Sequence, residues 1–182
     1  MKWIALFSQT GTEILKLTSI ATPDLIITNN MDYNGPLENV VKIKKADDVY
    51  KYLIEVTKNE DKDSVVITLH GWLRIIPGDV IAQLPPIYNG HPAPIFIYPE
   101  LKGLDPQIRL FEGIKEGKYK YIGSVVHEVA EAVDEGEIVY TNAVELKDSE
   151  RSTMKFKQLD TRLRNLSYET WREFLEVIVN DR

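Results

Sequence analysis

Cysteine is absent from this chain of 182 residues. Its absence excludes disulfide bonds, thiolate zinc sites and a cysteine nucleophile. Histidine is also scarce: His70, His91 and His127 are the only three, and they are too scattered for a recognisable metal-ligand spacing. We therefore expect no bound metal. A chain without thiols is consistent with a reducing compartment, so we expect a cytoplasmic protein.

Long apolar runs are missing as well. The N-terminal run ends at Phe7, and the residues from Ser8 to Thr10 are polar. A signal peptide needs a longer apolar stretch and a small-residue cleavage site. No other run approaches the roughly 20 apolar residues that cross a bilayer. We therefore expect no membrane partner.

Concentrated positive charge is missing too. The formal net charge is −6 and the pI is about 5.2. Basic residues gather only at 42–45 and 151–164, where acidic residues lie within the run or close to it. Nucleic-acid binding requires a basic patch that offsets such a net charge. We interpret both segments as solvated faces and expect no nucleic-acid partner.

The sequence also lacks the common glycine-rich phosphate loops. It has no Gly-x-x-x-x-Gly-Lys run and no two-glycine dinucleotide fingerprint. The segment from Ser8 to Glu13 contains only Gly11, which is a weak phosphate signal, and a helix N-cap at Thr10 or Thr12 explains it adequately. Nucleotide hydrolysis and hydride transfer therefore lack their usual markers.

The composition is that of an ordinary globular protein, with 43% hydrophobic and 27% charged residues. Apolar runs predict four strands in the first half, at 2–7, 24–28, 40–43 and 64–69. Helical spacing between them predicts helices at 12–20 and 47–57. This alternation is typical of an α/β fold of Rossmann type, with a doubly wound, mostly parallel central sheet and helices on both faces. We expect one domain over residues 1–182, because no repeat or linker interrupts it.

Turn residues are denser in the second half. Five prolines and Gly90 fall between residues 84 and 100, which argues against a helix there and predicts a shaped, exposed loop. The remaining patterns predict a helix at 105–116, strands at 121–130 and 137–146, and a C-terminal helical element at 149–182, broken near 165–167.

Three polar side chains offer acid–base chemistry. Asn89 and His91 are two residues apart, so in an extended segment their side chains point to the same side. Asn89 offers an amide donor there, and His91 offers a group that titrates near neutrality. Asp134 follows a strand pattern, before Gly136, where a carboxylate could orient a histidine. The residues alone also allow three other interpretations: Asn89 forms a local turn, His91 is simply exposed, and Asp134 is a turn residue. His127 lies in a strand pattern and favours a buried core position.

These segments, taken in order, resemble those of the folate-dependent formyltransferases. The residues from Val65 to Ile76 are similar to the family's strand and the segment that follows it. Asn89-Gly90-His91-Pro92 corresponds to the signature Asn-x-His-Pro, and the run from His127 to Asp134-Glu135-Gly136 corresponds to the later histidine and Asp-x-Gly loop. The resemblance extends over 64–146 and is only topological outside it. The phosphoribosylglycinamide members of the family are closest in length.

The resemblance implies transfer of a formyl group from 10-formyltetrahydrofolate to a primary amine of a small sugar or nucleotide acceptor, with glycinamide ribonucleotide as one candidate. It implies a place in one-carbon metabolism and purine biosynthesis. Asn89 would hydrogen-bond the formyl oxygen, His91 would polarise that oxygen and move protons, and Asp134 would hold the histidine and a bridging water.

The resemblance also implies two binding regions. The folate cofactor would contact Leu73, Arg74, Ile75, Ile76, Glu128, Val129, Ala130, Glu131 and Val133. The acceptor would contact Thr10, Gly11, Thr12 and Glu13. The chain departs from the glycinamide enzymes in this second region, because Gln9 and the acidic Glu13 replace small residues, and Gly90 replaces a bulky residue. We therefore expect an acceptor that differs from glycinamide ribonucleotide or is bound less tightly at its phosphate.

Two other functions fit the same residues. A hydrolase that releases formate from the same cofactor would use the three polar groups to activate water. A non-catalytic folate- or nucleotide-binding protein would keep the pocket without needing all three. The partners we expect are a small-molecule amine and, as one option, a second copy of the chain in a homodimer.

Overall fold

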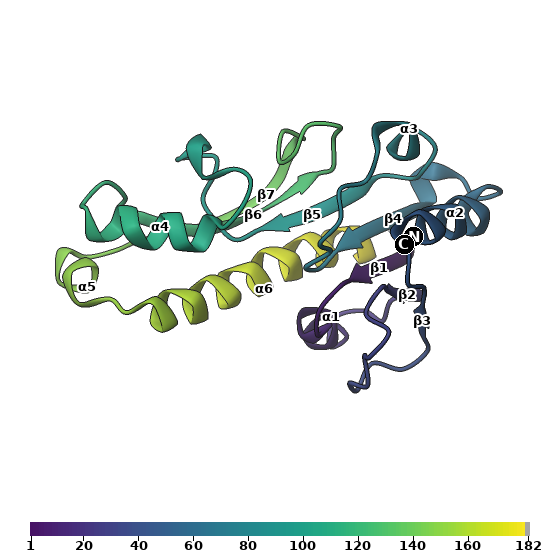
Figure 1. Ribbon diagram of the computed structural model, residues 1–182, viewed down its shortest axis with the longest axis horizontal. Helices are drawn as coiled ribbons and strands as arrows, with labels where there is room; N and C mark the ends of the chain where they lie inside the picture. Colours follow the sequence, from purple (N-terminus) through teal and green to yellow (C-terminus); the bar gives the residue numbers. More distant parts are fainter. Residues whose placement is uncertain (181–182) are drawn as a thin grey trace.

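One seven-stranded sheet organises the computed structural model, which describes residues 1–180 (Figure 1). The strands are β1 (Lys2–Phe7), β2 (Leu25–Thr28), β3 (Val40–Lys42), β4 (Val65–Leu69), β5 (Ile87–His91), β6 (Tyr121–Glu128) and β7 (Ile138–Glu145). Their order across the sheet is β3-β2-β1-β4-β5-β6-β7. The first five are parallel, β6 runs antiparallel to β5, and β7 runs antiparallel to β6. The predicted mostly parallel α/β sheet is confirmed.

Helices cover both faces of this sheet. They are α1 (Thr12–Leu17), α2 (Ala46–Thr57), α3 (Gly78–Ile81), α4 (Pro106–Lys115), α5 (Asp148–Thr153) and α6 (Phe156–Asn180), with 3-10 turns at η1 (Lys62–Ser64) and η2 (Pro99–Leu101). The alternation of side chains along β1 produces the two layers. Trp3, Ala5 and Phe7 pack with residues of α1 and α6, whereas Ile4 and Leu6 pack with residues of α2. No helix within residues 1–180 is long and apolar enough to span a membrane.

The prediction of an exposed loop at 84–100 is wrong. Its centre is β5, which is hydrogen-bonded between β4 and β6, and His91 is only 4% exposed. Ala93 and Ile95 after it are fully buried in a core cluster with α4 and the start of α6. The prolines flank the strand rather than interrupt it, so the ladder loses no donor inside β5. The dense prolines therefore mark the two ends of β5 and do not indicate a loop.

The predicted break near residues 165–167 is also wrong, because α6 continues from Phe156 to Asn180. The helix runs along one face of the sheet and buries Leu163, Trp171 and Leu175 there (Figure 1). Burial of such an apolar face outweighs the weaker helix propensity of asparagine and serine. The expected C-terminal helical element therefore consists of α5 and one long helix, up to Asn180.

Candidate active site

Two neighbouring strands and one loop position the polar residues of the candidate active site. Asn89 and His91 lie two positions apart on β5, so both side chains leave the same face of the sheet. β6 places His127 directly opposite Asn89. Asp134 comes from the loop after β6, where its backbone adopts the left-handed conformation with a φ of 56°. Aspartate tolerates that conformation better than most residues.

Asp134 is the centre of this group. Its Oδ2 lies 3.1 Å from His91 Nδ1, and its Oδ1 lies 3.2 Å from His127 Nε2. The backbone N–H of Gly103 donates to Asp134 Oδ2 over 2.8 Å. Asn89 Nδ2 lies 3.4 Å from His127 Nε2. The structure thus brings Asn89, His91 and Asp134 together and adds His127, for which the strand pattern had favoured a core position.

Each imidazole contacts Asp134 through one ring nitrogen and a backbone carbonyl through the other. His91 Nε2 lies 3.0 Å from the Leu101 carbonyl, and His127 Nδ1 lies 2.9 Å from the Glu128 carbonyl. A carbonyl only accepts, so each of these nitrogens carries a proton and donates it. A neutral imidazole has a single N–H, and the nitrogens that face Asp134 need a further proton to donate to it. The group is therefore arranged to hold and release protons, as general acid–base catalysis requires.

The ionised form of Asp134 is favoured despite burial. Loss of solvent acts to raise the pKa of Asp134, but hydrogen bonds from His127 and His91, the charge of His91 and the Gly103 N–H hold that pKa well below its ordinary range. The carboxylate therefore stays negative at neutral pH, between the two imidazoles.

Asp134→Asn is expected to remove part of the acid sensitivity of folding. The pKa of Asp134 is lower in the folded chain than in the unfolded chain, so its ionised form stabilises the fold above about pH 4 and this contribution is lost as the pH falls further. Urea denaturation at several pH values should show a lower free energy of unfolding for the variant at pH 7 and a shallower decline towards pH 2.

The matched control for this measurement is Asp32→Asn, which changes an exposed aspartate in the loop after β2. It should follow the wild-type curve. An Asp134→Asn curve parallel to that of the wild type would contradict the assigned ionisation.

A cavity of about 410 Å³ opens beside the polar group and is lined by Asn89, His127 and Asp134. Eight of the nine residues expected to contact the cofactor line it as well: Leu73, Arg74, Ile75, Ile76, Val129, Ala130, Glu131 and Val133. Glu128, the ninth of these residues, does not line the cavity. It follows His127 on β6, and strand alternation turns its exposed side chain to the other face of the sheet. Its contribution is the carbonyl that His127 contacts.

Apolar side chains surround the mouth of this cavity. Leu73, Ile75, Val133 and Leu104 are all more than half exposed, and Leu104 reaches 88%. Exposed apolar residues gathered around a concave site are typical of a ligand-binding surface. Sequence analysis did not select Leu104, which lies far along the chain from the other three.

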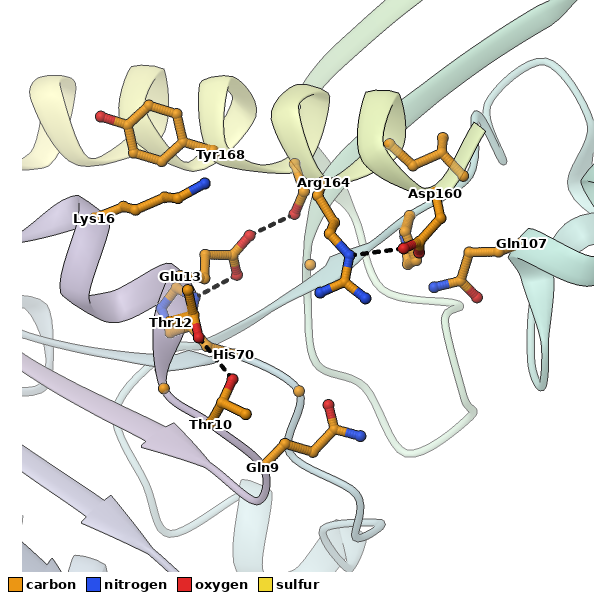
Figure 2. Close-up of a pocket in the computed structure, with 16 residues that line it drawn as sticks. Gln9, Thr10, Thr12, Glu13, Lys16, His70, Gln107, Asp160, Arg164 and Tyr168 are labelled. Atoms are coloured by element: carbon orange, nitrogen blue, oxygen red, sulfur yellow. Dashed lines mark hydrogen bonds and ion pairs between the residues drawn. The ribbon is translucent and has the colours of Figure 1, made fainter. Parts of the chain in front are cut away.

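A second cavity, of about 270 Å³, is lined by all four residues expected to contact the acceptor: Thr10, Gly11, Thr12 and Glu13 (Figure 2). Side chains of α6 form its opposite wall. Gly90 lines this cavity and the adjacent Asn89 lines the first, so β5 separates the two. In the described part of the chain, no cluster of three or more histidine, aspartate or glutamate side chains is arranged to hold a metal ion.

Trp171 of α6 explains the glycine between Asn89 and His91. A Cβ atom at Gly90 would lie 2.6 Å from Trp171 Nε1, closer than real Cβ contacts. The indole is 1% exposed, and its ring centroid lies 4.5 Å from that of His70. The Trp171 indole of α6 therefore fills the space that a bulky side chain at position 90 of β5 would occupy.

Comparisons with known proteins agree with this architecture. The model of the formyl transferase family matches residues 13–172. A phosphoribosylglycinamide formyltransferase of Dictyostelium discoideum is 33% identical over 85 residues, a segment that spans 43% of this chain and 40% of that protein.

Solved structures share the fold over the whole chain. The phosphoribosylglycinamide formyltransferase from Anaplasma phagocytophilum has a TM-score of 0.77 and 21% identity, with coverage of 100% of this chain and 88% of that chain. A sugar N-formyltransferase from a Shewanella species has a TM-score of 0.69 and 16% identity, with coverage of 100% and 71% respectively.

Proposed function

The chain belongs to the formyl transferase family, and from this membership we propose that it transfers a formyl group from 10-formyltetrahydrofolate to a primary amine of a small sugar or nucleotide acceptor. The observation that carries the proposal is the polar group Asn89, His91, His127 and Asp134 between two cavities. One cavity suits the donor and the other the acceptor, so the amine and the formyl carbon meet beside these side chains.

The residues present fit the donor. A volume of about 410 Å³ lies within the range of small-molecule sites, and the exposed apolar side chains of Leu73, Ile75 and Val133 offer contact to a flat ring. The Val129 N–H already donates to the Ile87 carbonyl, so the peptide groups of residues 130–131 offer the hydrogen-bond donors and acceptors to the edge of that ring. When bound, the donor supplies an electrophilic formyl carbon and a nitrogen leaving group.

The side chains divide the chemistry between them. Asn89 donates a hydrogen bond to the formyl oxygen as negative charge develops on it. The attacking amine forms a C–N bond and must lose one proton, while the leaving nitrogen gains one as its bond to the formyl carbon breaks. His91 lines neither cavity and its Nδ1 faces Asp134, so it moves the proton from the amine to the leaving nitrogen by way of a bridging water held by Asp134. Asp134 contacts both imidazoles and holds His91 and His127 in place.

The same proposal assigns the protein to cytoplasmic one-carbon metabolism. Purine biosynthesis follows if the acceptor is glycinamide ribonucleotide, and the names of the relatives in Dictyostelium discoideum and Anaplasma phagocytophilum support that option. The sugar N-formyltransferase from the Shewanella species supports an amino sugar as the other option.

The proposal predicts release of tetrahydrofolate only when donor and amine are both present. The purified protein is incubated with 10-formyltetrahydrofolate and, separately, with each of several amino-sugar and amino-nucleotide acceptors. Absorbance should report tetrahydrofolate formation with at least one of them, above the rate without amine. Equal rates with and without every amine would contradict transfer to an amine.

A further inference from the structure

Glu13 is an acidic side chain built into the second cavity. Its side chain extends from the first turn of α1 towards α6 (Figure 2) and contacts both His70 and Ser167. Ser167 Oγ donates to Glu13 Oε1 over 2.7 Å, and His70 Nδ1 lies 2.8 Å from Glu13 Oε2. The side chain is 27% exposed, and Glu13 lines the cavity. Each carboxylate oxygen thus has one protein donor and retains room for another.

A buried chain of hydrogen bonds holds His70 against this carboxylate. The indole N–H of Trp3 can only donate, and Thr68 Oγ1 accepts it over 2.7 Å. The hydroxyl proton of Thr68 then remains for His70 Nε2, 2.9 Å away. His70 is left with its proton on Nδ1, which it donates to Glu13. All three residues are buried, so the orientation of the imidazole is determined by the core.

The contacts of Glu13 favour the ionised form of its carboxylate. Burial acts to raise the pKa of Glu13, but the hydrogen bond from His70, the hydroxyl of Ser167 and the charge of Lys16 together lower it below its ordinary value. A negative charge therefore lies on the wall of the cavity at neutral pH.

The charges around the cavity do not favour a phosphate. Its lining contains two acidic side chains, Glu13 and Asp160, and two basic ones, Lys16 and Arg164. Arg164 Nε already donates to Asp160 Oδ2 over 2.9 Å. A dianion would therefore meet a balanced set of charges, with Glu13 repelling it. The other polar lining side chains carry amide, hydroxyl or imidazole groups: Gln9, Thr10, Thr12, His70, Gln107, Ser167 and Tyr168.

We infer that this cavity recognises a sugar by its hydroxyl groups, which donate hydrogen bonds to Glu13, and that it does not select for a phosphate. The inference rests on the proposed function and names the acceptor class: an amine carried on a neutral, hydroxylated sugar. Glu13 is the specificity-determining residue. A bound acceptor displaces water from the Glu13 carboxylate, so a substrate that offers no hydroxyl group in exchange binds more weakly.

Matched acceptors test the inference. Glycinamide riboside and glycinamide ribonucleotide differ only by the phosphate, as do D-glucosamine and D-glucosamine 6-phosphate, and glycinamide lacks the sugar. The wild type should use the unphosphorylated member of at least one pair with a kcat/KM equal to or above that of its phosphate. Glycinamide should be a poorer acceptor than either of its sugar derivatives.

The Glu13→Gln variant tests the residue. A hydrogen bond to a charged group contributes more than one to a neutral group, so KM for the unphosphorylated sugar amine should rise about 10- to 100-fold. The KM for 10-formyltetrahydrofolate should not change, and kcat should remain within about threefold of the wild type because Glu13 is not placed to move protons. The control is Glu55→Gln, an exposed acid on α2 at the opposite face of the sheet, which should behave as wild type.

Three results overturn the inference while leaving formyl transfer intact. The first is a preference of tenfold or more for the phosphorylated member of both pairs. The second is a Glu13→Gln variant with an unchanged KM for the sugar amine. The third is turnover of glycinamide at the rate of its riboside. If no amine in the panel stimulates tetrahydrofolate release, the proposed function fails and the inference fails with it.

Discussion

His91→Ala is expected to lower kcat by about two to four orders of magnitude, because it removes the group that moves the proton from the amine to the leaving nitrogen. KM for the donor should change little, since His91 does not line the donor cavity. Steady-state kinetics with saturating donor and acceptor measures both values.

Because His91 is buried, its replacement by alanine also affects stability, and a second variant is needed to separate that effect from the loss of catalysis. The side chain contacts Asp134 and the Leu101 carbonyl, so alanine removes one buried partner from each and lowers the free energy of unfolding by about 1–3 kcal/mol. His91→Asn keeps a polar amide at the position and should be equally inactive with a smaller loss of stability. Circular dichroism and thermal unfolding establish that the variants are folded. A folded variant with wild-type kcat would contradict the role of His91.

Asn89→Ala is expected to lower kcat by about two to three orders of magnitude, the usual effect of losing one donor to a developing oxyanion. The effect should fall on kcat rather than on the KM of either substrate, because the hydrogen bond strengthens only as charge develops. The side chain has no strong partner in the structure, the nearest being His127 Nε2 at 3.4 Å, so the fold should tolerate the change.

The matched control is Asn142→Ala, which alters a half-buried asparagine on β7 that lines neither cavity. Its kcat should equal that of the wild type. Equal losses of kcat in Asn89→Ala and Asn142→Ala would show that the effect is structural and would contradict the oxyanion role of Asn89.

Local sequence patterns predicted much of the sheet because its strands bury continuous apolar runs. The segments 2–7 and 64–69 became β1 and β4, and the spacing at 47–57 became α2. The two errors have tertiary causes. β5 forms between its flanking prolines because β4 and β6 supply partners on either side, and α6 stays helical through 165–167 because its apolar face packs on the sheet.

The site was predictable only where its residues form a local motif. Asn89 and His91 stand two apart and were selected from their spacing, whereas His127 looked like any histidine in a buried strand. Its role depends on Asp134, which the loop after β6 returns to the sheet. Glu13 was noticed for its charge, but its partners His70 and Ser167 lie 57 and 154 positions away. Such contacts arise from the fold, and no local pattern reports them.

The destination of the formyl carbon tests the central claim most directly. The protein is mixed with 10-formyltetrahydrofolate labelled at that carbon and with the best amine of the panel, and a single turnover is followed by NMR. The account predicts that the label appears in a formylated amine, with one tetrahydrofolate released for each amide formed, and that Asn89→Ala slows this step. Label recovered only as free formate would contradict the account and would indicate a hydrolase.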